Sequence, residues 1–152
     1  SWEEIRAGIE SLTPVSGRNH LIHTDKWTLL DDCYNANPVS MYASLDVLSN
    51  ALGRKVAILG DMGELGVNEK LLHYNVGCHA VDAGIDVLLL AGELSREMER
   101  GAKAKNPDQI VHWFATKEEL IEALPMLLVR GDSILVKASH FMEFGEIVEA
   151  LK

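Results

Sequence analysis

The chain has 152 residues, of which 47% are hydrophobic and 24% charged, a composition typical of one soluble globular domain. Its formal net charge of -9 argues against nucleic acid or an anionic membrane surface as a partner, because binding to such surfaces depends on Lys and Arg contacts. The two cysteines show neither zinc-site spacing nor a C-x-x-C pairing, which favours a reducing, cytoplasmic compartment, and no apolar run is long enough to cross a bilayer. The chain begins on Ser1 without an initiator methionine, as expected for a piece of a longer protein.

The first predicted element is a short helix over residues 2–10. Ser1 and Glu4 have the S-x-x-E spacing of a capping box, and apolar residues recur on one face of the segment. Pro14 and Gly17 then predict a turn.

The remaining elements are a β-hairpin, formed by HLIH (20–23) and WTLLD (27–31), followed by regular alternation of strand and helix. Nearly continuous apolar runs, typical of strands buried on both faces, occupy residues 55–59, 86–92, 110–114 and 133–138. Helical spacing of apolar residues occupies about 39–52, 68–83, 93–104, 117–129 and 140–151. This alternation predicts an α/β fold, a Rossmann-like, doubly wound, mostly parallel sheet with an antiparallel hairpin at one edge. Without a linker or an internal repeat, residues 1–152 are expected to form a single domain.

Four polar clusters follow predicted strands. In a parallel sheet all strand carboxyl ends meet at one edge, where open α/β sheets build their ligand sites. We therefore expect these clusters to share one rim: DDCYNANP (31–38), GDMGELG (60–66), AGELS (91–95) and KASHF (137–141).

The DDCYNANP cluster holds more polar groups than a helix start requires. Asn37 is a favoured N-cap and Pro38 suits the first helical turn, so these two residues have a purely structural interpretation. The other polar residues could hydrogen-bond sugar hydroxyls, a ring nitrogen or a cation. They are Asp31, Asp32, Tyr34 and Asn35.

The GDMGELG cluster matches neither the G-x-G-x-x-G of dinucleotide folds nor a Walker phosphate loop. Its glycines are equally well explained as residues that permit tight turns. Asp61 and Glu64 remain candidates for the rim.

Three further residues are candidates for anion binding. Lys137 ends a predicted buried strand, where a charge needs a partner, and Ser139 with His140 is predicted to begin the final helix, whose exposed amides favour an anion. A histidine at a helix start can equally be a cap or a surface residue. The other histidines show no spacing typical of a catalytic triad or a metal site.

Arg18 lies in the turn before the hairpin, 14 residues before Asp32. A single arginine in a turn is usually solvated. The hairpin could fold it back beside Asp32, however, and a guanidinium next to a carboxylate is suited to holding a phosphate while hydrogen-bonding a ribose.

These motifs, read together, resemble the C-terminal domain of the Mur ligases. PVSGR, LLDDCYNANPVSMYASLDVL, VAILGDMGELG and ILVKASHFMEFGEIVEAL occur in the order and spacing of that family, over essentially the whole chain. The likeness is greatest to members that add D-alanyl-D-alanine to UDP-N-acetylmuramoyl-tripeptide. The family pattern K-G-S-R is replaced here by Lys137, Ala138, Ser139 and His140, so the role of the family arginine does not carry over directly, although a protonated histidine could replace it.

The resemblance implies an ATP-dependent, amide-forming ligase of peptidoglycan synthesis that works through an acyl phosphate. Arg18 and Asp32 match the arginine and the aspartate that the family brings to the nucleotide. We further expect nucleotide contacts from Tyr34, Asn35 and Asn37, and substrate contacts from Asp61, Lys137, Ser139 and His140, with Lys137 and Ser139 at the dipeptide carboxylate. The phosphate loop and the Mg ligands of the family belong to a central domain, so the central and N-terminal domains of the same ligase are the expected partners. A monomer is expected, and the 152 residues alone should be inactive in a ligase assay.

Two alternatives remain open on the sequence. The chain could be a stand-alone flavodoxin-like module that binds a small ligand. It could also be the equivalent domain of a sibling Mur ligase or of a folylpolyglutamate synthase, with the same mechanism and a different amine.

Overall fold

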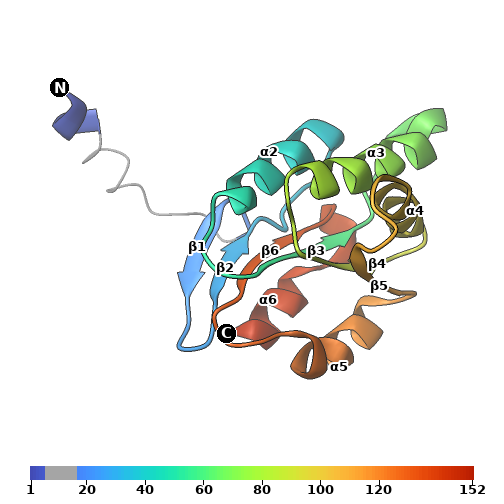
Figure 1. The fold of residues 1–152 in the computed structure, drawn as a ribbon. Coiled ribbons are helices and arrows are strands. Elements are labelled where there is room, and N and C mark those ends of the chain that lie inside the picture. Colours follow the sequence, from blue (N-terminus) through green and yellow to red (C-terminus); the bar gives the residue numbers. More distant parts are fainter. Residues whose placement is uncertain (6–16) are drawn as a thin grey trace.

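The computed structural model describes residues 1–5 and 17–152 and contains a six-stranded sheet (Figure 1). The strands are β1 (His20–His23), β2 (Thr28–Asp31), β3 (Lys55–Gly60), β4 (Val87–Ala91), β5 (Ile110–Phe114) and β6 (Ser133–Lys137). Their order across the sheet is β1-β2-β6-β3-β4-β5. β1 runs antiparallel to β2, and all other neighbours are parallel. This confirms the predicted α/β sheet with an antiparallel hairpin at one edge.

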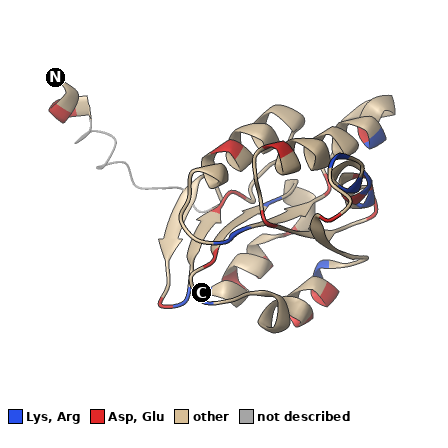
Figure 2. Ribbon diagram, in the orientation of Figure 1, with Lys and Arg blue, Asp and Glu red and all other residues tan. Residues whose placement is uncertain are grey.

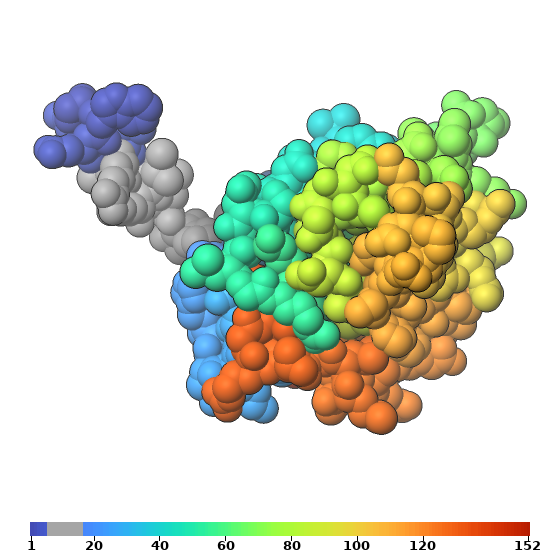
Figure 3. All heavy atoms as spheres, in the orientation of Figure 1, coloured from blue at the N-terminus to red at the C-terminus, as the bar shows by residue number. Residues whose placement is uncertain are grey.

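Helices cover both faces of the sheet. They are α2 (Pro38–Ser49), α3 (Glu69–Asp82), α4 (Ser95–Lys105), α5 (Lys117–Leu127) and α6 (Gly145–Leu151), with short 3-10 helices η1 (Gly66–Asn68) and η2 (His140–Met142). α2, α3 and α4 lie on one face, and α5 and α6 lie on the other (Figure 1). In the space-filling view α2 and α3 lie side by side (Figure 3).

Two separate cores result from the alternation of side chains along the central strands. Val56 and Ile58 of β3 are fully buried against the core of α5 and α6, whereas Ala57 and Leu59 are fully buried against the core of α2, α3 and α4. Because successive side chains of a strand point to opposite faces, a strand between two helical layers must be apolar at every position. This explains the continuous apolar runs in the sequence.

The predicted helix over residues 2–10 is only partly covered by the described residues. Residues 2–5 are helical, and the Glu4 backbone N–H donates to Ser1 Oγ at 3.2 Å, as a capping box requires. The rest of this helix and the turn at Pro14 lie outside the described residues.

The predicted final helix is wrong in its first part. Residues 140–142 form the 3-10 helix η2, and α6 begins only at Gly145. Glu143 between them has a left-handed backbone with φ 54°, and the following Phe144 is fully buried. The break turns the Phe144 ring into the core, so Ser139 and His140 begin the 3-10 helix η2 and not α6. The predicted anion contact at this helix start stays a prediction.

The basic residues of α4 do not form a free basic surface. Basic residues gather on α4 (Figure 2), but each has a local partner. Arg100 pairs with Glu97, Lys105 with Asp82, Lys103 donates to the Gln109 carbonyl, and Arg96 lies over the Trp113 ring.

Among the described helices, none combines the length and the apolar character that a membrane span requires.

Candidate functional site at the carboxyl edge of the sheet

The four polar clusters meet at one edge of the sheet, as predicted. The Ser139 N–H donates to the Asp61 carbonyl at 3.0 Å, the Gly63 N–H donates to Ser139 Oγ at 2.7 Å, and the Leu94 N–H donates to the Asp61 carboxylate at 3.2 Å. Between these loops lies a cleft of about 630 Å³, whose lining includes Asn35, Gly63, Glu64, Ser139 and His140. This volume is in the range of small-molecule sites.

The turn that bears Arg18 is fixed on both sides by carboxylates. The Gly17 N–H donates to Asp31 Oδ2 at 2.9 Å, and the Asn19 N–H donates to Asp32 Oδ1 at 3.2 Å. Gly17 and Asn19 both have positive φ, 81° and 47°, so the backbone bends sharply around Arg18. The predicted proximity of Arg18 and Asp32 is therefore confirmed, with the contact made by the neighbouring backbone.

The Arg18 side chain stacks on the Tyr34 ring, which in turn lies next to the His140 ring. Its guanidinium carbon lies 3.9 Å from the centre of the Tyr34 ring, and the Tyr34 and His140 rings are 5.3 Å apart. Among the described residues Arg18 has no ion-pair partner, and it is exposed. Stacking orients the guanidinium while its N–H groups stay available for an anion.

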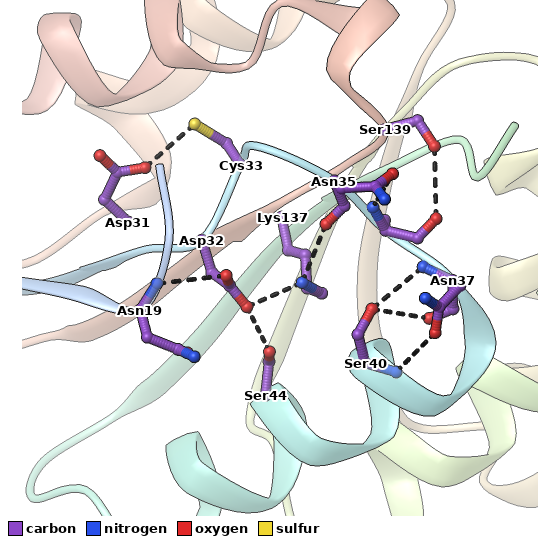
Figure 4. A network of polar contacts seen from close by, with 11 residues as sticks. Asn19, Asp31, Asp32, Cys33, Asn35, Asn37, Ser40, Ser44, Lys137 and Ser139 are labelled. Atoms are coloured by element: carbon purple, nitrogen blue, oxygen red, sulfur yellow. Dashed lines mark hydrogen bonds and ion pairs between the residues drawn. The ribbon is translucent and has the colours of Figure 1, made fainter. Parts of the chain in front are cut away.

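Asp32 lies in a buried polar network (Figure 4). Its Oδ2 accepts hydrogen bonds from Lys137 Nζ at 2.7 Å and from Ser44 Oγ at 2.5 Å. Lys137 Nζ also donates to the Asn35 carbonyl at 3.0 Å. The exposed fraction is 8% for Asp32 and 2% for Lys137, so this is a buried ion pair whose members are also hydrogen-bonded.

Asp31 faces the opposite side of β2, with a different partner. Its Oδ1 accepts a hydrogen bond from Cys33 Sγ at 3.0 Å. Burial, together with the hydrogen bond to Asp31, raises the pKa of the Cys33 thiol to about 12. Cys33 is therefore a neutral donor at physiological pH.

Asn35 and Asn37 are exposed, and the side-chain oxygen of each accepts a hydrogen bond from a nearby backbone N–H. Asn37 Oδ1 caps α2 by accepting from the Ser40 N–H at 2.9 Å, and Ser40 Oγ accepts from the Asn37 N–H, which completes a capping box. Asn35 Oδ1 accepts from the Ala36 N–H at 2.8 Å. Within the described chain the two side-chain amide nitrogens have no hydrogen-bond partner. The structural interpretation of Asn37 is confirmed, and its ligand contact stays a prediction.

Asp61 and Ser139 connect loops of the rim. Asp61 Oδ1 accepts from both the N–H and the Oγ of Ser95, each at 2.7 Å, which places a carboxylate at the N-terminus of α4. Asp61 and Ser139 are 8% and 5% exposed. Their side-chain oxygens already have hydrogen-bond partners inside the protein, and their predicted ligand contacts stay predictions.

Sequence reasoning missed two residues that support the site. His73 is fully buried, and its Nε2 accepts from the Met62 N–H at 2.9 Å while its Nδ1 lies 2.6 Å from the Glu69 carbonyl, which anchors the GDMGELG loop to α3. Ser44 contacts Asp32 from α2. Ser44 lies on the apolar face of α2 and His73 on that of α3, and a polar residue at such a position was the available signal. The signal did not identify the residue that each side chain contacts.

A second cleft lies at the opposite edge of the sheet. It measures about 640 Å³ and is lined by the hairpin turn, α5 and the end of α6, with Trp27, Leu124 and Arg130 among its residues. None of the predicted site residues lines it. Across residues 1–5 and 17–152, no group of three or more His, Cys, Asp or Glu side chains is arranged to hold a metal ion.

The doubly wound sheet and the polar loops at its carboxyl edge define an α/β domain with a candidate ligand site at the strand ends. The family model "Mur ligase, glutamate ligase domain" matches residues 17–140, and the chain belongs to this family. It is 37% identical to the UDP-N-acetylmuramoyl-tripeptide--D-alanyl-D-alanine ligase of Escherichia coli and 39% identical to that of Treponema pallidum, in each case over 99% of the chain. The chain spans about a third of the length of these relatives.

Solved structures of similar proteins share the fold. The MurF of Acinetobacter baumannii superposes with a TM-score of 0.83 at 30% identity, and the match covers 99% of this chain and 34% of that one. The MurF ligase of Thermotoga maritima, solved in complex with ADP, superposes with a TM-score of 0.78 at 25% identity over 92% of this chain and 31% of that one.

Proposed function

We propose that the chain is the C-terminal domain of a cytoplasmic, monomeric ligase that joins D-Ala-D-Ala to UDP-N-acetylmuramoyl-tripeptide in peptidoglycan synthesis. In the proposed reaction ATP phosphorylates the tripeptide carboxylate, and the dipeptide amine attacks the acyl phosphate. The relatives whose names state this activity match 99% of the chain. The N-terminal and central domains would provide the phosphate loop and the Mg ligands.

The observation that carries the proposal is the placement of Arg18. Asp31 and Asp32 fix its turn, Tyr34 supports its guanidinium, and the described residues leave its charge without an ion-pair partner. A planar, oriented guanidinium can bind two oxygens of a phosphate at once. We assign Arg18 to the phosphate charge of ATP.

Asp32 is the proposed contact for the ribose. A carboxylate offers about four acceptor positions, and the described contacts fill three of them. The remaining position is on Oδ1, which can accept one hydroxyl. Tyr34, Asn35 and Asn37 extend from this point along the same loop and would line the adenine and dipeptide side.

His140 is the proposed contact on the dipeptide side of the cleft. It is exposed and lines the cleft, whereas Lys137 and Ser139 are buried. A protonated imidazole there would favour the dipeptide carboxylate. We expect the acyl phosphate to need protection from water, which a neighbouring domain closing over this rim would provide.

Substitution in the intact ligase tests the proposal. We expect Arg18→Ala and Asp32→Ala each to lower kcat/KM for ATP roughly 10- to 100-fold, because hydrogen bonds to charged groups contribute about 1.5–3 kcal/mol. Steady-state kinetics with varied ATP measure this. Arg100→Ala is the control, since Arg100 pairs with Glu97 on the outer surface of α4. Unchanged ATP kinetics in both variants would show that the assignment is wrong.

A further inference from the structure

Lys137 is enclosed in a way that separates it from the cleft. Its ammonium has three N–H donors, of which one goes to Asp32 Oδ2 and one to the Asn35 carbonyl. Only 2% of the residue is exposed, and it does not line the cleft that His140 and Ser139 share. The third N–H has no partner among the described residues, but at this degree of burial a ligand carboxylate could reach it only if the surrounding loop moved.

Ser44 acts on the same carboxylate from the other side. It is 4% exposed on the inner face of α2, and its hydroxyl donates to Asp32 Oδ2 at 2.5 Å. Ser44 and Lys137 thus converge on one oxygen from a helix and from the central strand β6. Two donors on Oδ2 and the Asn19 N–H on Oδ1 fix the carboxylate plane.

The free acceptor position of Asp32 therefore has a fixed direction. A carboxylate held by three donors loses little rotational freedom when it binds a hydroxyl, and preorganisation of this kind contributes to affinity. Neither Lys137 nor Ser44 needs to touch the ligand for this effect.

We infer that Lys137 and Ser44 are positioning residues for ATP, which act through the Asp32 carboxylate, and that Lys137 does not bind the dipeptide. The inference rests on the proposed function, and it reassigns Lys137 from the dipeptide to the nucleotide. It predicts that loss of either side chain raises the KM for ATP without a matching rise in the KM for D-Ala-D-Ala.

Kinetics of Ser44→Ala and Lys137→Met in the intact ligase test it. We expect Ser44→Ala to raise the KM for ATP about three- to tenfold, the effect of one hydrogen bond, and Lys137→Met to raise it more, while the KM for D-Ala-D-Ala changes less than about twofold. Two controls are matched in type. Ser49→Ala removes a hydroxyl that bonds only within α2, and Lys103→Met removes a lysine at the end of α4.

The outcomes separate this inference from the proposed function. If the dipeptide KM rises alone, if both constants rise equally, or if neither changes, the inference is overturned. If Lys137→Met unfolds, as loss of one partner of a buried pair can cause, Ser44→Ala alone decides. If Arg18→Ala and Asp32→Ala also leave the ATP kinetics unchanged, the proposed function fails with the inference. If either variant impairs ATP use, only the inference fails.

Discussion

Asp31 and Asp32 are neighbours in the chain, but their side chains lie on opposite faces of the sheet and have different partners. Asp31 bonds Gly17 and Cys33, whereas Asp32 bonds Asn19 and Lys137. This follows from the two-residue period of an extended strand. Two consecutive acids thus fix one turn from both faces of β2, and the turn presents Arg18.

The Cys33 thiol provides a test of this arrangement. Its pKa is raised to about 12 by burial and by the hydrogen bond to Asp31, so the thiolate fraction at pH 8 is very small and grows about tenfold per pH unit. We expect Cys33 to resist iodoacetamide at pH 8 in the folded chain, while the less buried Cys78 reacts faster. Mass spectrometry of digested samples measures both rates, with urea-unfolded chain as the control. Equal labelling of the two cysteines in the folded chain would contradict the described hydrogen bond.

At the residue level, the sequence predicted which types of side chain gather at the rim but not how they bond. The proximity of Arg18 to Asp32 could be predicted, because a hairpin must return the chain. The contact of Lys137 with Asp32 joins residues 105 positions apart, and the sheet register decides it. The contacts of Ser44 and His73 depend on helix rotation, which no local pattern reveals.

At the level of elements, α3 and α4 approach each other closely through two glycines. A methyl group at Gly77 would overlap the Met98 carbonyl oxygen, and a methyl group at Gly101 would overlap the Tyr74 carbonyl oxygen. Each glycine therefore faces the backbone of the partner helix. This contact fixes α4, whose N-terminus binds the Asp61 carboxylate at the rim.

Substitution of these glycines should destabilise the protein. We expect Gly77→Ala to lower the free energy of unfolding by about 2–3 kcal/mol, because a side chain that meets backbone forces the helices apart, and this exceeds the gain in helix propensity. Urea denaturation measures the change. Gly145→Ala is the matched control, because a methyl group there meets no atom within 4 Å, so it should be neutral or stabilising. Equal stability of Gly77→Ala and the unmodified chain would refute the close packing.

Most elements could be predicted from periodicity, since a sheet covered on both faces requires continuous apolar strands and amphipathic helices. The segment after β6 could not. Its apolar spacing fits one helix, but the left-handed Glu143 divides it and turns Phe144 inward. Position 143 itself carries a glutamate, which does not favour a left-handed backbone, and Gly145 two residues later is the only local signal of a break.

At the level of the whole molecule, the chain corresponds to about a third of its relatives, and its candidate site is an open rim. The described residues provide an oriented cation at Arg18, one open acceptor on Asp32 and a cleft beside His140. These features suit a domain that contacts nucleotide and dipeptide while a neighbouring domain holds the reacting phosphates, which is the central claim.

A crystal structure of the intact ligase with a nonhydrolysable ATP analogue and D-Ala-D-Ala tests that claim most directly. We predict that the Arg18 guanidinium contacts a phosphate oxygen, that Asp32 Oδ1 accepts one ribose hydroxyl while Oδ2 keeps Lys137 and Ser44, and that the dipeptide lies beside His140. A nucleotide bound at the opposite edge of the sheet, near Trp27 and Arg130, or one that does not contact this domain at all, would contradict it.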